Sequence, residues 1–170
     1  YDFETYQKNN IECEMVVTNV HTGEAEYLSE KEDVERLCRI CRASASMPLA
    51  SPEVEIDGKV YLDGGAADSI PLGRSLKTGH RKNVVILTRP YGYRKKFSGK
   101  IGRLYVPMIK QYPNLVKKNK HRAKYYNRQV EKIERLEQEG KIFVIRPTVS
   151  WPKRTEVDRD KLERFYYHGY

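Results

Sequence analysis

The sequence has no long hydrophobic run and little cysteine, and each absence excludes a class of protein. No apolar stretch approaches the ~18 residues that a membrane-spanning helix needs, and no signal peptide is visible. The three cysteines, Cys13, Cys38 and Cys41, are too few and odd in number for the disulfide framework of a small secreted domain. We therefore expect a cytoplasmic protein whose contact with any membrane is peripheral.

The cysteines and histidines also lack the pattern of a metal site. Cys38-x-x-Cys41 has the spacing of half a zinc site, but no second pair follows it, and the four histidines are scattered. Because the two thiols fall three residues apart in an expected helix, packing explains them better than metal binding. We predict neither a metal nor a cofactor.

Acidic residues are missing from a long central block. Residues 69–130 carry 17 Lys and Arg and no Asp or Glu, whereas residues 1–68 carry 6 Lys and Arg against 15 Asp and Glu. Such a block suggests an anionic partner, either phospholipid head groups or nucleic acid. The alternative is a solvated basic surface balanced by the acidic first part. The side chains that could stack on nucleic-acid bases would be Tyr91, Tyr93, Tyr105, Tyr125 and Tyr126.

Periodicity in the first part of the chain predicts a hairpin and a helix. Residues 11–20 alternate as a strand, and residues 25–28 return as its partner. Ser29 with Glu32 three residues later forms a capping box, so a helix is expected to begin there. The apolar stripe of that helix would be Val34, Leu37, Cys38 and Cys41, and its end would come before Pro48 and Pro52.

Later segments alternate between helices and strands. We expect helices over 72–78, 101–112 and 113–139, strands over 83–88 and 141–146, and a last helix capped by Asp158. The stripe of the long helix would be Tyr126, Val130, Ile133 and Leu136. This order predicts an α/β fold, a layered sheet of mostly parallel strands with β-hairpins and flanking helices.

The most informative stretch is 54–71. Two short alternating runs, 54–56 and 60–62, flank Asp57-Gly58, which is a strong signal for a tight hairpin. The second run ends on Asp63, and the glycines at 64 and 65 let the backbone turn sharply and be approached closely. A carboxylate at a strand end beside bare backbone is suited to be a general base, although Asp-Gly is also common in surface turns.

The order of motifs around this stretch has a counterpart in a known family. Arg42-Ala-Ser-Ala-Ser-Met-Pro48 precedes the hairpin, and Asp63-Gly-Gly-Ala-Ala-Asp-Ser-Ile-Pro71 follows it. This arrangement resembles the C-terminal half of the bacterial patatin-like phospholipases, in which Arg-Ala-Ser-x-x-x-Pro, a hairpin, Asp-Gly-Gly or Asp-Gly-Ala and a helix-opening proline follow in that order. The resemblance implies that residues 1–170 form a single domain with an incomplete patatin-like fold.

The resemblance also implies an activity, the hydrolysis of lipid acyl esters by a Ser–Asp dyad. Asp63 matches the dyad aspartate, which would take the proton of the serine hydroxyl directly. The residues that would support it are Gly64, Gly65, Arg42, Ser44, Pro48 and Pro71. The implied partners are a lipid or ester substrate and an anionic membrane surface that meets the basic block 69–130.

The serine that such a dyad needs is not in this sequence. No Gly-x-Ser-x-Gly turn occurs, since Gly73-Arg-Ser75-Leu-Lys77 fails at its last position, and neither Ser44 nor Ser46 lies in such a turn. In the resembled family the serine and the oxyanion-hole loop lie N-terminal to the matching region. We therefore expect this chain to be the C-terminal portion of a longer protein, and to be inactive without the N-terminal part.

Two other functions stay open at this point. One is nucleic-acid binding through the basic block, although no recognised nucleic-acid motif occurs. The other is a non-catalytic scaffold. Asp68 is a second candidate carboxylate, but the following Ser-Ile-Pro makes it look like a residue at the entry to a helix. The lipid acyl hydrolase is the function that we favour.

Overall fold

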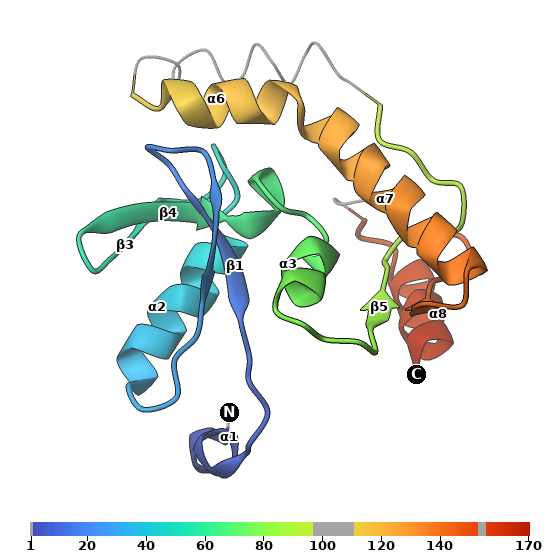
Figure 1. Cartoon of the computed structure of the whole chain (residues 1–170), viewed down its shortest axis with the longest axis horizontal. Helices are drawn as coiled ribbons and strands as arrows, with labels where there is room; N and C mark the ends of the chain where they lie inside the picture. The colour runs from blue at the N-terminus through green and yellow to red at the C-terminus, as the bar shows by residue number, and fades with distance from the viewer. Residues whose placement is uncertain (1, 97–110, 153–155) are drawn as a thin grey trace. The chain divides into compact units, whose positions relative to one another are not determined.

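A computed structural model describes residues 2–96, 111–152 and 156–170 (Figure 1). The chain divides into two compact units. The first unit comprises residues 1–71 and 96–126, and the second comprises residues 72–95 and 127–170. Both combine helices with strands, so the fold is mixed α/β as predicted. The expected helix over 101–112 lies outside the described residues except for its last two positions.

The first unit is built on a four-stranded antiparallel sheet. Its strands are β1 (Met15–Asn19), β2 (Ala25–Leu28), β3 (Val54–Ile56) and β4 (Lys59–Asp63), in the order β2-β1-β4-β3. The two hairpins each force an antiparallel pair, because a short turn reverses the chain direction. β1 and β4 then join the hairpins, with Val17 opposite Asp63 and Asn19 opposite Tyr61.

The turn between β3 and β4 has the geometry that its two residues favour. Asp57 and Gly58 both have positive φ, 51° and 72°, as a tight hairpin turn of this kind requires. The pairing on either side runs from Ile56 opposite Lys59 to Val54 opposite Tyr61. The hairpin predicted from the sequence is therefore confirmed.

Each face of this sheet is covered by one helix (Figure 1). Helix α2 (Val34–Ala45) covers one face, where Val17, Ile40 and Tyr61 belong to a single buried cluster. Helix α6 (Pro113–Lys120) covers the other face, where Leu62 and Leu115 are buried together. Successive residues Tyr61 and Leu62 thus serve opposite cores, as the two-residue period of a strand dictates.

Helix α2 begins later than the sequence suggested. Its N-cap is Asp33, whose carboxylate accepts hydrogen bonds from the backbone N–H groups of Glu35 and Arg36. The expected capping box at Ser29 and Glu32 is therefore wrong. The apolar stripe is also shifted, because the buried side chains are Leu37, Ile40 and Ala43, whereas Val34, Cys38 and Cys41 are exposed.

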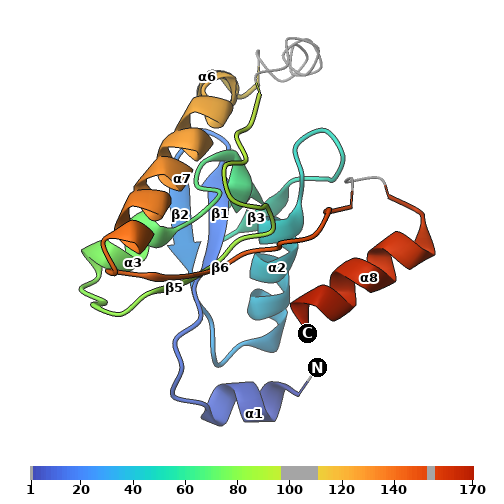
Figure 2. The ribbon, with the colours of Figure 1, turned by 90° about the vertical axis from the view of Figure 1, so that its right-hand side faces the viewer.

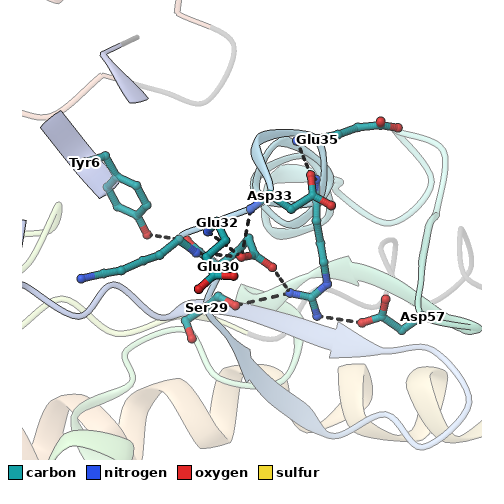
Figure 3. A network of polar contacts seen from close by, with 9 residues as sticks. Tyr6, Ser29, Glu30, Glu32, Asp33, Glu35 and Asp57 are labelled. Atoms are coloured by element: carbon teal, nitrogen blue, oxygen red, sulfur yellow. Dashed lines mark hydrogen bonds and ion pairs between the residues drawn. The ribbon is translucent and has the colours of Figure 1, made fainter. Parts of the chain in front are cut away.

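The segment before α2 folds around the Glu30 carboxylate (Figure 3). One oxygen accepts hydrogen bonds from the N–H groups of Lys31, Glu32 and Asp33, and the other accepts from the Arg36 guanidinium at 2.8 Å. Arg36 also binds Asp57 in the hairpin turn, at 2.7 Å. The backbone N–H of Glu32 and the Arg36 side chain lower the pKa of Glu30 to about 2.

The short N-terminal helix α1 (Phe3–Lys8) is tied to the same segment. The Tyr6 hydroxyl donates to the carbonyl of Glu30 at 3.0 Å, and Lys31 Nζ donates to the carbonyl of Asn9 at 2.6 Å. No side chain of α1 is buried. These polar contacts therefore hold the helix against the loop that precedes α2.

The second unit contains a two-stranded parallel sheet, β5 (Val84–Ile86) and β6 (Phe143–Ile145), which lie side by side in Figure 2. Helices α3 (Leu72–Lys77) and α8 (Arg159–Gly169, capped by Asp158) agree with the sequence prediction. The prediction of mostly parallel strands is wrong, because the larger sheet is wholly antiparallel. Within β5 only Val85 is buried, whereas Val84 and Ile86 are exposed.

The long helix predicted over 113–139 is two helices. Helix α6 ends at Lys120, and helix α7 (Arg122–Gln138) begins after His121. The predicted stripe holds in the second helix, where Tyr126, Val130 and Ile133 are buried and Leu136 is partly buried. Glu134 is also buried, and it accepts hydrogen bonds from Arg94 at 2.6 Å and from the N–H of Gly92 at 3.2 Å.

Replacing Glu30 by Gln should weaken the fold in a pH-dependent manner. The folded protein lowers the pKa of Glu30 from 4.5 to about 2, so its carboxylate stabilises the fold above about pH 5 and loses this effect as the pH falls towards 2. We expect E30Q to lower the free energy of unfolding by about 1 kcal/mol at neutral pH. Urea unfolding as a function of pH measures the difference, which should shrink below about pH 5.

The matched control is E35Q. Glu35 pairs with Arg39 on the exposed side of the same helix, where its side chain is 77% exposed. This variant should change the unfolding free energy by less than about 0.5 kcal/mol. A constant E30Q effect across the pH range would contradict the assignment of the stabilising role to the Glu30 carboxylate.

Replacing Gly64 by Ala should destabilise the first unit strongly. A Cβ at residue 64 would lie 2.2 Å from the carbonyl oxygen of Val16, a backbone atom that cannot move without disturbing β1. We expect a loss of about 3 kcal/mol, measured by thermal or urea unfolding. Gly65→Ala is the control, because a Cβ there meets only the ends of side chains, and it should cost no more than about 1 kcal/mol.

Candidate active site

Asp63 lies at the last position of β4, and its backbone is fixed on both sides. Its N–H donates to the carbonyl of Ser46 at 2.8 Å. Its carbonyl accepts a hydrogen bond from the hydroxyl of Thr18, also at 2.8 Å, and Thr18 is fully buried in β1. The strand end is therefore held by α2 on one side and by β1 on the other.

One oxygen of the Asp63 carboxylate is held by a hydrogen bond, and the other accepts none from the described residues. Its Oδ1 caps the short 3-10 helix η1 (Gly64–Ala66) by accepting a hydrogen bond from the N–H of Gly65 at 2.6 Å. Among the residues that the structure describes, none donates a hydrogen bond to Oδ2. The side chain is partly exposed. This arrangement fixes the direction of the carboxylate and leaves one oxygen free to accept a proton.

The two glycines after Asp63 have different roles. Gly64 is buried against β1, where a Cβ would collide with the backbone of Val16. At Gly65 a Cβ would instead lie 2.9 Å from Asp63 Oδ1 and 3.3 Å from Arg122 Nη2. Gly64 therefore allows close packing. Gly65 lets a carboxylate oxygen and a guanidinium nitrogen both come close to the backbone.

The segment that the sequence singled out upstream, residues 42–48, reaches the site through Ser46. Ser46 is the buried C-cap of α2, and its hydroxyl donates to the carbonyl of Arg42 at 2.8 Å. Its own carbonyl accepts the N–H of Asp63. The Arg42 side chain is exposed, and Ser44 and Pro48 are partly buried. This segment therefore supports Asp63 through backbone atoms.

Of the remaining predicted residues, Asp68 is engaged elsewhere and Pro71 is exposed. Asp68 accepts a hydrogen bond from the hydroxyl of Tyr27 at 2.6 Å, and its N–H donates to the carbonyl of Gly64 at 2.8 Å. These bonds make Asp68 part of the framework of the corner. Pro71 directly precedes α3, as predicted for a helix-opening proline.

Arg122 is the residue at this corner that the sequence did not point to. It is the first residue of α7, and its side chain is partly buried beside Gly65. Its Nε is buried without a hydrogen-bond partner. No motif marks this arginine within a block rich in Lys and Arg, so only the folded structure shows its position. Thr18 was missed as well, although a polar residue inside an apolar strand is a usable signal.

The basic block has exposed cations close in sequence to Arg122. Lys117 and Lys120 on α6 and Lys124 on α7 are exposed, whereas Lys118 pairs with Glu24 at 2.9 Å. Of the tyrosines considered as stacking platforms, Tyr126 is buried and Tyr93 contacts Trp151 and Arg89. Tyr91 and Tyr125 are exposed, and Tyr105 lies outside the described residues.

Comparisons with known families agree with part of the sequence interpretation. Across the described part of the chain, no helix is both long and apolar enough to cross a membrane. A comparison with curated protein sequences finds no match. Residues 112–170 match the model of a family described as a domain of unknown function, DUF6363. Residues 5–75, which include the Asp63 corner, match the model described as patatin-like phospholipase. This match supports a relationship to the patatin-like family, and the family suggests a lipid hydrolase.

Proposed function

We propose that this chain contributes the aspartate of a Ser–Asp dyad to a hydrolase of lipid acyl esters, and that Asp63 is this residue. The observation that carries the proposal is the Asp63 carboxylate itself, held by the Gly65 N–H through one oxygen, while the other oxygen accepts no hydrogen bond from any residue that the structure describes. It lies inside the segment that matches the patatin-like phospholipases. A fixed carboxylate with one available oxygen can accept the proton of a hydroxyl.

The chemistry follows from the difficulty of hydrolysing an ester at neutral pH. A serine hydroxyl attacks the ester carbonyl only if a base takes its proton, and in a dyad the carboxylate does this directly. Asp63 Oδ2 would be that acceptor, at roughly 2.6–3.2 Å from the serine oxygen. The proton would then pass to the departing alcohol, and water would release the acyl group in a second step.

The serine and the oxyanion-hole donors would come from polypeptide outside these 170 residues. None of the serines in this sequence lies in a Gly-x-Ser-x-Gly turn. Ser46 and Ser69, which lie near Asp63, already donate hydrogen bonds to backbone carbonyls. We therefore assign the chain the role of base carrier and expect the 170 residues alone not to hydrolyse esters.

The basic block would attract the enzyme to an anionic lipid surface. The exposed Lys117, Lys120 and Lys124 belong to the same unit as Asp63. Each lysine near such a surface contributes about 1 kcal/mol to binding. Nucleic acid would be attracted by the same charge, but the burial of Tyr126 removes one of the five candidate stacking side chains.

Replacing Asp63 by Asn should abolish ester hydrolysis by the complete gene product. The amide keeps the size and one acceptor oxygen but cannot take a proton, so kcat should fall by about 10²- to 10⁴-fold. Turnover of a short-chain fatty acyl ester measures the loss, with circular dichroism as the check on folding. The control is D68N, which changes the carboxylate held by Tyr27. Full activity of D63N would refute the proposed base.

Replacing Lys117, Lys120 and Lys124 together by Gln should weaken binding to anionic vesicles. At about 1 kcal/mol for each lysine, the dissociation constant should rise by about 10²-fold. Co-sedimentation with phosphatidylglycerol vesicles measures it, with phosphatidylcholine vesicles as the uncharged comparison. The control makes the same change in net charge at Lys132, Lys141 and Lys161, outside the block. Equal weakening by both triple variants would contradict a role of this surface in docking.

A further inference from the structure

Arg122 combines three features that together call for an explanation. Its side chain reaches the corner of Asp63, where Nη2 lies 3.3 Å from the position of a Cβ on Gly65. Its Nε is removed from solvent without a hydrogen bond. Its guanidinium forms no ion pair with a carboxylate among the described residues. An arginine donor that is desolvated and unpaired costs free energy, so it calls for a missing partner.

Asp63 is not that partner. The two side chains both approach Gly65, but they form no ion pair within 4.0 Å in the described structure. A direct bond would also occupy the carboxylate oxygen that a base needs. Both side chains can approach the backbone there because residue 65 has no side chain. The corner therefore brings a carboxylate and a guanidinium to the same glycine without pairing them.

We propose that Arg122 binds the phosphate group of a glycerophospholipid substrate next to Asp63, an inference that rests on the function proposed above. The planar guanidinium presents several N–H donors in a geometry that matches phosphate oxygens. In such a lipid, the ester oxygen at the middle glycerol position is separated from phosphorus by two carbons and one oxygen. A base and a phosphate-binding group on either side of one glycine therefore suit one substrate molecule.

The proposed role of Arg122 also connects the two regions of the chain that match family models. Arg122 lies in the region that matches the domain of unknown function, whereas Asp63 lies in the patatin-like region. Both belong to the first compact unit, in which Tyr112 and Leu115 of the same matched region are buried against Leu62. The beginning of the domain of unknown function thus supplies a substrate-recognising side chain to the acyl hydrolase site.

The test compares two substrates that differ only in the phosphocholine group, which carries the phosphate. The complete gene product and its R122Q variant are assayed on a monomeric phosphatidylcholine with two short acyl chains, and on the diacylglycerol with the same chains. We expect R122Q to raise KM for the phosphatidylcholine by about 10- to 100-fold. KM for the diacylglycerol should stay within about twofold. The ratio of kcat/KM for the two substrates does not depend on the fraction of enzyme that is folded.

Two further variants complete the experiment. R122K keeps the charge but not the planar donor pattern, so it should lower the same ratio by a smaller factor. K132Q removes an exposed charge ten residues further along the same helix and outside the basic block, and it should leave the ratio unchanged. This control separates the proposed contact from a general attraction between positive charge on this helix and phosphate.

The outcomes distinguish this inference from the proposed function. An equal loss on both substrates would assign Arg122 a structural role and overturn the inference, while ester hydrolysis itself would stand. An unchanged ratio in R122Q would overturn it as well. If the unaltered protein hydrolyses neither substrate, the proposed function is wrong and the inference falls with it.

Discussion

The first unit depends on the pairing of β1 with β4 and on the close contact at its end. Val17 of β1 and Asp63 of β4 lie opposite each other, and directly beyond this pair Gly64 packs on the backbone of Val16. Because only a residue without a side chain fits there, the chain can turn immediately after Asp63. That turn aims the carboxylate at the N–H of Gly65, and the rest of the candidate site follows from it.

Three separate parts of the chain support the same aspartate. The C-cap of α2 accepts its N–H, the hydroxyl of Thr18 binds its carbonyl, and the glycine turn binds its carboxylate. A side chain that is fixed in this way loses little conformational entropy when it engages another group. The segment 42–48 therefore matters for its carbonyl groups, which explains how it supports the site while the Arg42 side chain is exposed.

The boundary between the two matched families does not coincide with the boundary between the compact units. Residues 112–126 fall in the region that matches the domain of unknown function, and they belong to the unit formed mainly by the patatin-like region. Leu115 is fully buried in the core that also holds Val20 and Leu62. The start of the second family is therefore part of the hydrophobic core that carries Asp63.

Local signals in the sequence predicted most of the elements, because they depend on neighbouring residues. Asp57-Gly58 specified the hairpin turn, the spacing of Tyr126, Val130 and Ile133 specified the buried face of α7, and Asp158 specified the start of α8. The beginning of α2 was misjudged because Asp33 competes with Ser29 for the cap. Glu30 then binds the N–H groups of the loop, a role that no pairwise motif predicts.

The sequence by itself determined the hairpins, the buried face of α7 and the carboxylate at the end of a strand, since each follows from residues close together in the chain. The pairing of β1 with β4, which joins the two hairpins into one sheet, and the break at His121 were decided by tertiary structure. So was the position of Arg122 beside Gly65. These features depend on contacts between residues distant in sequence, whose free energies outweigh local preferences and leave no periodic pattern.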